Sequence, residues 1–100
     1  MILVRNVFKV HFGKSKDAIA AWKETLGVAK RLGFTAKSRL LTDLVGDFYT
    51  VVFENEFSSL AEFEGAAKNM MANPDWQSAY AKISALTESG YREIFNIVSE

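Results

Sequence analysis

Apolar and polar side chains alternate along residues 2–12, and one of the two alternating rows is apolar except at Asn6. Residues 35–44 and 48–57 are two further strand candidates, of which the second alternates sharply, and residues 91–98 are a last one. Alternation of this kind is typical of strands that turn one face to a hydrophobic core. A short Gly-containing connection joins the second and third segments, which is typical of a β-hairpin. The pattern therefore predicts four strands.

Between the strands, apolar residues recur at every third or fourth position, which is the spacing of an amphipathic helix. One helix is expected to begin with Ser15 as its N-cap and to end at Gly33. Residues Ser59–Glu62 form a capping box that begins a second helical stretch. Within that stretch, Asn73-Pro74 can end one helix and cap the next, so we expect two segments that meet at an angle.

These elements follow one another in the order β-α-β-β-α-β, with Gly90 between the last helix and the last strand. A chain of 100 residues is expected to form a single domain over residues 1–100. Right-handed crossovers place the first strand between the third and the fourth. The predicted fold class is therefore α+β: a ferredoxin-like, four-stranded antiparallel sheet with its helices on one face.

The face of this sheet that carries no helix is expected to be partly apolar. A face left to water should be polar, and a cluster of aliphatic side chains there implies a partner. The aliphatic residues assigned to this face, as a dimer interface, are Val7, Val52, Ile94 and Val98. The residues of the last strand assigned to the helix side are Tyr91, Phe95 and Ile97. Two such sheets packed face to face would form a symmetric homodimer.

Charge is unevenly distributed along the chain, although the net charge is zero. Residues 1–40 carry nine Lys or Arg and two Asp or Glu, whereas residues 41–100 carry three and ten. The two parts can neutralise each other by lying side by side, within one chain or between subunits. Alternatively, the basic part can steer an anionic ligand toward itself.

Signatures of known chemistry are sparse. The chain has no Cys, which excludes disulfides, thiolate metal sites and cysteine nucleophiles. His11 is the only His and has no convergent set of ligands around it, so no metal site is predicted. An RNA-recognition domain would share the topology, but it needs exposed aromatic rings on its central strands. The rings of residues 48–57 are assigned to the helix side, so no nucleic-acid partner is expected.

The start of the chain shows neither a secretion signal nor a membrane span. Its apolar run is interrupted by Arg5 and Lys9, which neither kind of segment tolerates well. We therefore expect a cytoplasmic protein with no membrane partner.

Three stretches of the sequence resemble a known family. They are Thr50-Val51-Val52-Phe53-Glu54, Ser59-Leu60-Ala61-Glu62-Phe63-Glu64 and Asn73-Pro74-Asp75-Trp76-Gln77. In this succession they are similar to the NIPSNAP-like members of the dimeric α/β-barrel superfamily, and the similarity extends over nearly the whole chain. Leu3 and Phe12 depart from the family pattern, which tends to have an acidic residue and a proline at these places. The resemblance implies a homodimer in which two sheets form a barrel.

The resemblance also implies a pocket between sheet and helices, which related antibiotic-biosynthesis-type monooxygenases and haem-degrading enzymes use. Tyr80 occupies the position of the axial His of the haem-degrading enzymes, so neither haem nor another cofactor is expected. Related monooxygenases carry a pocket Asn on the first strand, which Asn6 matches, although a core amide bonded to neighbouring backbone would look the same in the sequence. The residues expected to line the pocket are Asn6, Trp22, Trp76, Tyr80 and Tyr91.

Three functions remain open. The chain can bind a small apolar or aromatic molecule between sheet and helices. It can instead be a cofactor-independent monooxygenase or isomerase, in which Asn6, Trp76 and Tyr80 polarise the substrate and no further catalytic residue is assigned. The third function is that of a structural dimerisation module with a filled core. A cavity beside Asn6 would separate the first two functions from the third.

Overall fold

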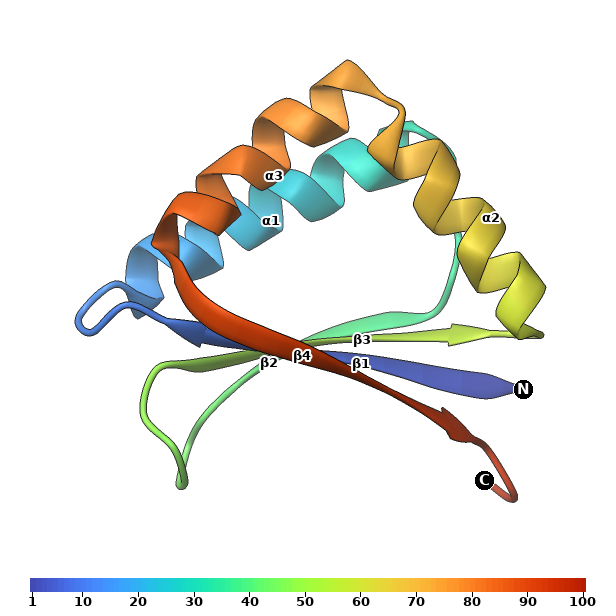
Figure 1. Ribbon diagram of the computed structural model, residues 1–100, viewed down its shortest axis with the longest axis horizontal. Coiled ribbons are helices and arrows are strands. Elements are labelled where there is room, and N and C mark those ends of the chain that lie inside the picture. The colour runs from blue at the N-terminus through green and yellow to red at the C-terminus, as the bar shows by residue number, and fades with distance from the viewer.

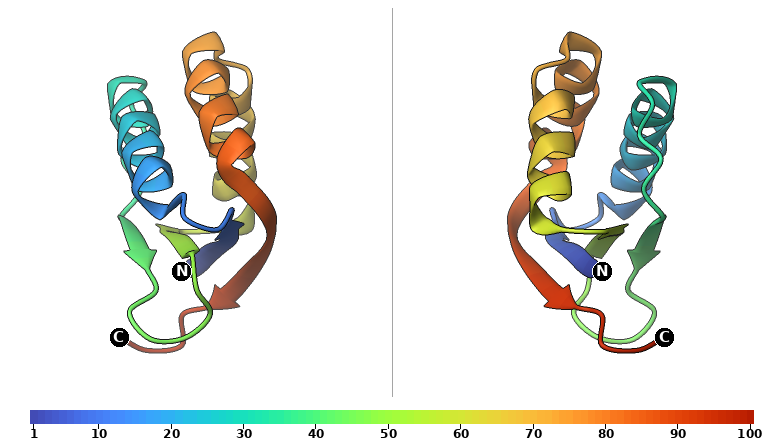
Figure 2. Two further views of the ribbon diagram at one scale, coloured as in Figure 1. Left: turned by 90° about the vertical axis from the view of Figure 1, so that its left-hand side faces the viewer. Right: turned by 90° about the vertical axis from the view of Figure 1, so that its right-hand side faces the viewer.

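The computed structural model describes all of residues 1–100. Its elements in chain order are β1 (Ile2–Val10), α1 (Ser15–Arg31), β2 (Ser38–Thr42), β3 (Thr50–Phe57), α2 (Leu60–Met71), α3 (Pro74–Leu86) and β4 (Thr87–Asn96). The sheet is antiparallel in the order β2-β3-β1-β4. All the helices lie on one of its faces (Figure 1; Figure 2). The predicted ferredoxin-like α+β fold is confirmed.

The predicted break in the second helical stretch is also confirmed. Ser59 caps α2, because its hydroxyl oxygen accepts a hydrogen bond from the Glu62 backbone N–H at 3.1 Å. Asn73 caps α3, because its Oδ1 accepts from the backbone N–H groups of Asp75 and Trp76 at 2.9 and 3.4 Å. As a result α2 and α3 meet at an angle and span the sheet like an inverted V (Figure 1).

The start of α1 differs from the prediction. Lys14, not Ser15, occupies the N-cap and makes no side-chain capping bond, and Ser15 is the first helical residue. The end of α1 is as predicted. Gly33 follows the C-cap Leu32 with a φ of +89°, a conformation that glycine adopts without strain.

The last strand begins earlier than predicted. α3 ends at Leu86 and β4 begins at Thr87, so Gly90 lies within a strand and ends no helix. A Cβ atom at Gly90 would lie 2.8 Å from Cδ1 of Phe8 and 3.1 Å from the carbonyl oxygen of Val7. The close approach of β1, and not a helix end, therefore requires glycine at this position.

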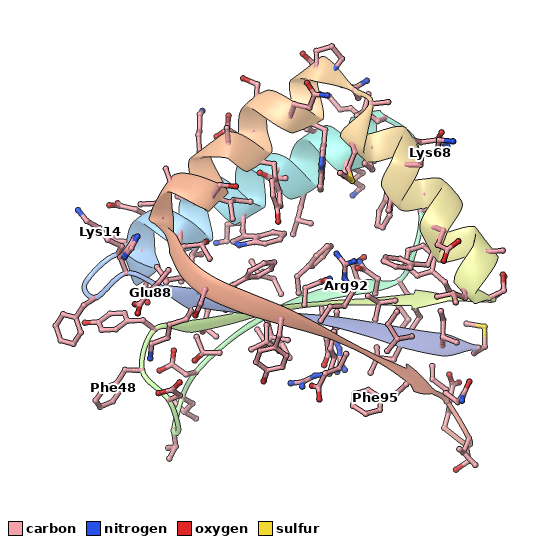
Figure 3. All side chains as sticks on the ribbon, viewed as in Figure 1. Lys14, Phe48, Lys68, Glu88, Arg92 and Phe95 are labelled. Atoms are coloured by element: carbon pink, nitrogen blue, oxygen red, sulfur yellow. The ribbon has the colours of Figure 1, made fainter.

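The register of β4 on β1 reverses the faces predicted for the last strand. Residues that lie opposite each other in an antiparallel pair share a face. Arg92 lies opposite Asn6, so Arg92 and Ile94 face the helices, whereas Tyr91 and Phe95 lie on the helix-free face. Figure 3 shows Arg92 and Phe95 on opposite sides of β4. The prediction was wrong because both rows of this strand contain apolar side chains, so alternation alone does not indicate the core side.

One residue assigned to the dimer interface consequently lies elsewhere, because Ile94 is on the helix side. Val98 follows the end of β4, where no pairing assigns it to a face, and 93% of its surface is exposed in the single chain. Val7 and Val52 lie directly opposite each other on the helix-free face, as predicted. Their part in a dimer interface stays a prediction.

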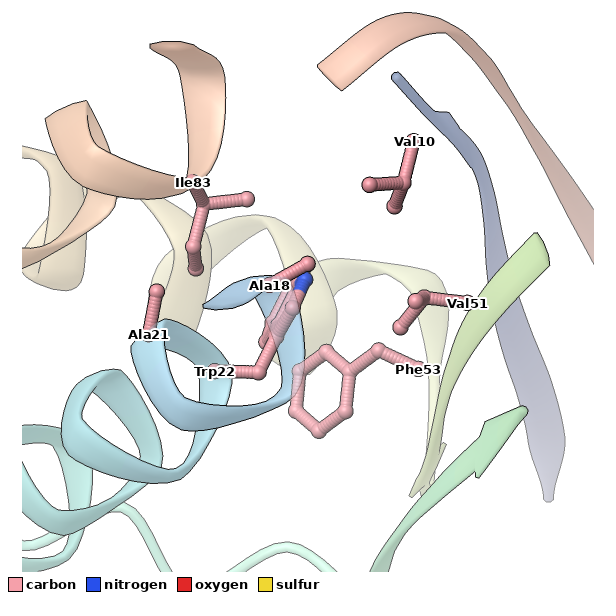
Figure 4. Packing of buried hydrophobic residues seen from close by; sticks show 7 residues of the cluster. All are labelled: Val10, Ala18, Ala21, Trp22, Val51, Phe53 and Ile83. Atoms are coloured by element: carbon pink, nitrogen blue, oxygen red, sulfur yellow. The ribbon is translucent and has the colours of Figure 1, made fainter. Parts of the chain in front are cut away.

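The hydrophobic core lies between the sheet, α1 and α3. Trp22 is the largest residue of this core. The centroid of its ring lies 5.0 Å from the ring centroid of Phe53 and 5.4 Å from that of Phe8. The buried cluster consists of Val10, Ala18, Ala21, Trp22, Val51, Phe53 and Ile83 (Figure 4). α2 contributes no fully buried residue. The space between α2 and the sheet is therefore less densely filled than the space beneath α1. No helix combines the length and the apolar character that a membrane span needs.

Candidate functional site

A pocket of about 620 Å³ lies between the helix side of the sheet and the three helices. Its volume is within the range of small-molecule binding sites. Ten of its 15 lining residues are hydrophobic. The lining residues are Asn6, Phe8, Trp22, Phe53, Asn55, Phe63, Ala67, Met70, Met71, Trp76, Gln77, Tyr80, Ala81, Ser84 and Arg92. The space beside Asn6 is therefore not filled by side chains of this chain.

Aromatic rings from α1 and α3 form one wall of the pocket. Trp76 and Tyr80 are one helical turn apart on α3, and their rings stack with centroids 5.8 Å apart and planes at 18°. The rings of Trp22 and Tyr80 are nearly perpendicular, with their centroids 6.3 Å apart and their planes at 88°. Trp22 is itself fixed in the core, so this wall is rigid at its base. Flat, apolar surfaces of this kind suit an aromatic or hydrocarbon ligand.

Asn6 is the polar centre of the sheet side of the pocket. It is buried in β1, where its Nδ2 donates to the carbonyl oxygen of Phe53 at 3.3 Å. Its Oδ1 accepts a hydrogen bond from Nε of Arg92 at 2.6 Å. The amide is therefore both satisfied by neighbours, as a core Asn should be, and part of the pocket wall.

Arg92 lies at the mouth of the pocket and is the only charged residue that lines it. Its guanidinium group stands over the ring of Phe63, with 5.1 Å between Cζ and the ring centroid. Nε is bonded to Asn6, whereas the two terminal amino groups take part in no hydrogen bond or ion pair of the chain. The pocket thus has an apolar interior and a positively charged rim.

The structure brings together four of the five residues predicted to line the pocket. Asn6, Trp22, Trp76 and Tyr80 all line it, from β1, α1 and α3. Tyr91 does not, because its position opposite Val7 puts its side chain on the helix-free face. It borders only a smaller hollow of about 440 Å³ along β4, which adjoins the first pocket. Ligand binding by these residues stays a prediction.

Arg92 and Phe63 were missed from the sequence. Phe63 follows the helical apolar pattern of α2, which does not distinguish a pocket wall from core. Because Tyr91 and Phe95 are expected on the helix side, the alternation puts Arg92 on the opposite face, and only the register that pairs it with Asn6 brings it to the pocket. A signal was present: a polar residue in the apolar row of one strand often pairs with a polar residue on its neighbour.

The helix-free face of the sheet is a second candidate surface. At its centre the buried Glu54 carboxylate accepts hydrogen bonds from Arg5 at 2.9 Å and Arg39 at 2.6 Å. Arg5 also pairs with Glu93 at 3.1 Å. The hydrogen bond to Glu54, reinforced by both carboxylates, raises the pKa of Arg5 above its ordinary value despite partial desolvation. This network of opposite charges lies among Val7, Val52, Leu41, Tyr91 and Phe95.

The chain contains no cluster of three or more His, Asp or Glu side chains placed to hold a metal ion. His11 follows the end of β1 and is exposed. Its backbone N–H donates to the carbonyl oxygen of Leu86 at the end of α3.

No family model matches the chain, and no curated protein sequence matches it either. Solved structures do share its fold. An uncharacterised NIPSNAP domain protein from Burkholderia xenovorans superimposes with a TM-score of 0.85 at 19% identity, covering 96% of this chain and 93% of that one. A NIPSNAP family protein from Agrobacterium tumefaciens gives a TM-score of 0.86 at 16% identity, covering 95% and 90%.

A third similar structure is that of SnoaB, a cofactor-independent oxygenase from Streptomyces nogalater. Its TM-score is 0.75 at 18% identity, and the match covers 99% of this chain and 94% of that one. Over nearly its whole length the chain therefore has the fold of the NIPSNAP proteins and of this oxygenase, which confirms at the level of the fold the resemblance found in its sequence.

Proposed function

We propose that the chain binds a small apolar or aromatic molecule in the pocket between sheet and helices. The observation that carries the proposal is the pocket itself, an apolar cavity with stacked rings on one wall and the amide of Asn6 on another. A few polar groups in a mostly apolar cavity are typical of sites that orient a small ligand.

Tryptophan fluorescence tests this proposal directly, because both Trp22 and Trp76 line the pocket. We expect saturable quenching by at least one member of a panel of quinones, anthrones and small phenols. Ala67→Phe should abolish the quenching, since the added ring would fill the pocket from α2. Ala61→Phe is the matched control on an exposed position of the same helix and should leave quenching unchanged. If no compound quenches the wild-type protein, the proposal is wrong.

A cofactor-independent oxygenase is the second candidate. It is supported by the fold shared with SnoaB and by the placement of Asn6, Trp76 and Tyr80 around one cavity. In such an enzyme these side chains would orient a hydroxyaromatic substrate for reaction with O₂. Oxygen uptake in the presence of a compound that quenches the tryptophans distinguishes the enzyme from a binding protein. Binding without uptake would leave the first candidate.

We also propose that two copies of the chain pack through the helix-free faces of their sheets. Apolar side chains on this face are exposed in the single chain: Tyr91 by 60%, Phe95 by 47% and Leu41 by 37%. Rings and aliphatic groups that cluster on an otherwise regular sheet are typical of a protein interface. The cytoplasmic location expected from the sequence stays a prediction.

A further inference from the structure

We propose that the ligand of the pocket is an acid: a molecule with an apolar or aromatic body and a carboxylate that pairs with the guanidinium group of Arg92. This inference rests on the proposed function, because it requires that the pocket bind a small molecule. It adds the chemical class of the ligand and the direction in which the ligand lies, with its body between the rings and its charge at the mouth.

The side chain of Arg92 is held in place before any ligand arrives. Asn6 fixes Nε from one side at 2.6 Å, and Phe63 lies under the guanidinium plane at 5.1 Å. Asn6 is in turn fixed by the carbonyl oxygen of Phe53. The two terminal amino groups remain available, and they are the pair that can bind a carboxylate through two parallel hydrogen bonds. Little side-chain entropy is therefore lost when such a ligand binds.

The charges around the pocket favour an anion. No Asp or Glu lines the pocket, and Arg92 has no carboxylate partner in the chain. The neighbouring Glu93 cannot neutralise it, because Glu93 lies on the opposite face of β4 and pairs with Arg5. Glu88 borders only the adjoining hollow. Arg92 therefore presents a positive charge that no carboxylate of the chain neutralises, beside a mostly apolar cavity.

Pairs of acids and their neutral amides test the inference with the whole chain. Isothermal titration would compare benzoate with benzamide, 2-naphthoate with 2-naphthamide, and indole-3-acetate with indole-3-acetamide. Each pair keeps the ring and changes only the charge. For at least one pair we expect the acid to bind about tenfold more tightly than the amide, as a charge-assisted, two-point contact should.

Variants of Arg92 then assign the preference to this residue. Arg92→Gln should weaken binding of the acid about tenfold and leave the amide unchanged, which removes the preference. Arg92→Lys should keep part of the preference, because it keeps the charge and loses the planar fork. Arg31→Gln, at an exposed position at the end of α1, is the control and should change neither affinity.

The outcomes separate the two proposals. Acid and amide bound equally tightly, or equally weakened by Arg92→Gln, would overturn the inference and leave the proposed function standing. If none of the six probes binds while a phenol or quinone quenches the tryptophans, the ligand is not an acid and the inference is again wrong. If nothing binds in either experiment, both proposals fail.

Discussion

Asn6 combines the two roles that the sequence left open. A lone polar residue in an apolar row can be a core amide or a pocket residue, and here the same side chain is both. Its Nδ2 satisfies a backbone carbonyl, and its Oδ1 holds Arg92 at the mouth of the pocket. The interruption in the hydrophobic pattern therefore marks a residue that lines the pocket. The role of Arg92 could not be predicted from a local pattern, because Arg92 and Asn6 are 86 positions apart in the chain.

A substitution of Gly90 tests how closely β4 approaches β1. Gly90→Ala would bring a Cβ to within 3.1 Å of a backbone oxygen of β1 and 2.8 Å of the Phe8 ring. We expect it to lower the free energy of unfolding by about 1–3 kcal/mol, the usual cost of overpacking. Gly65→Ala is the matched control, because nothing lies within 4 Å of its added Cβ on α2.

The control should have the opposite effect. Alanine is favoured over glycine in a helix, so Gly65→Ala should raise the free energy of unfolding by about 0.5–1 kcal/mol. Urea denaturation monitored by circular dichroism measures both changes. If Gly90→Ala is as stable as the wild type, β4 does not approach β1 as closely as described.

Among the elements, prediction from the sequence succeeded where a local signal determines the structure. The capping residues Ser59 and Asn73 act within three residues of themselves, and both helix starts were predicted correctly. Prediction from the sequence failed for β4, because the start of this strand and the face that each residue occupies depend on its pairing with β1. Tyr91 and Phe95 are large apolar residues of the kind expected on a core face, yet the register turns them away from the helices. Apolar side chains on both faces remove the contrast on which such a prediction depends.

The cap of α3 gives a prediction at this scale. Asn73→Ala removes the acceptor for two backbone N–H groups at the helix start. We expect it to lower the free energy of unfolding by about 1 kcal/mol. Ser78→Ala, at an exposed position of the same helix, is the control and should not destabilise the protein. Equal unfolding midpoints in urea for Asn73→Ala and the control would contradict the capping role.

At the scale of the whole molecule, the two faces of the sheet differ in what covers them. The helix side carries the pocket, which lies between the sheet and the three helices. The other side carries rings, aliphatic groups and a charge network without a covering layer (Figure 2; Figure 3). Binding and association should therefore be separable by substitution, because no residue that lines the main pocket lies among the exposed rings of the opposite face.

The double variant Tyr91→Lys with Phe95→Lys tests this separation. Both residues are exposed in the single chain, so the substitutions should not disturb the fold. In sedimentation at micromolar concentration, we expect the wild type at twice the 11.2 kDa mass of the chain and the variant at the single mass. Two lysines on each sheet would place four like charges in a closed, symmetric contact, which a dimer of this kind does not tolerate. The variant should still bind any compound that quenches the wild-type tryptophans, with unchanged affinity.

Ala61→Lys with Ala85→Lys is the control, because it adds the same charge to exposed positions of α2 and α3, and it should stay dimeric. A monomeric wild-type protein would show that the exposed rings serve another contact, whereas loss of ligand binding in the monomeric variant would show that the pocket depends on the second copy after all.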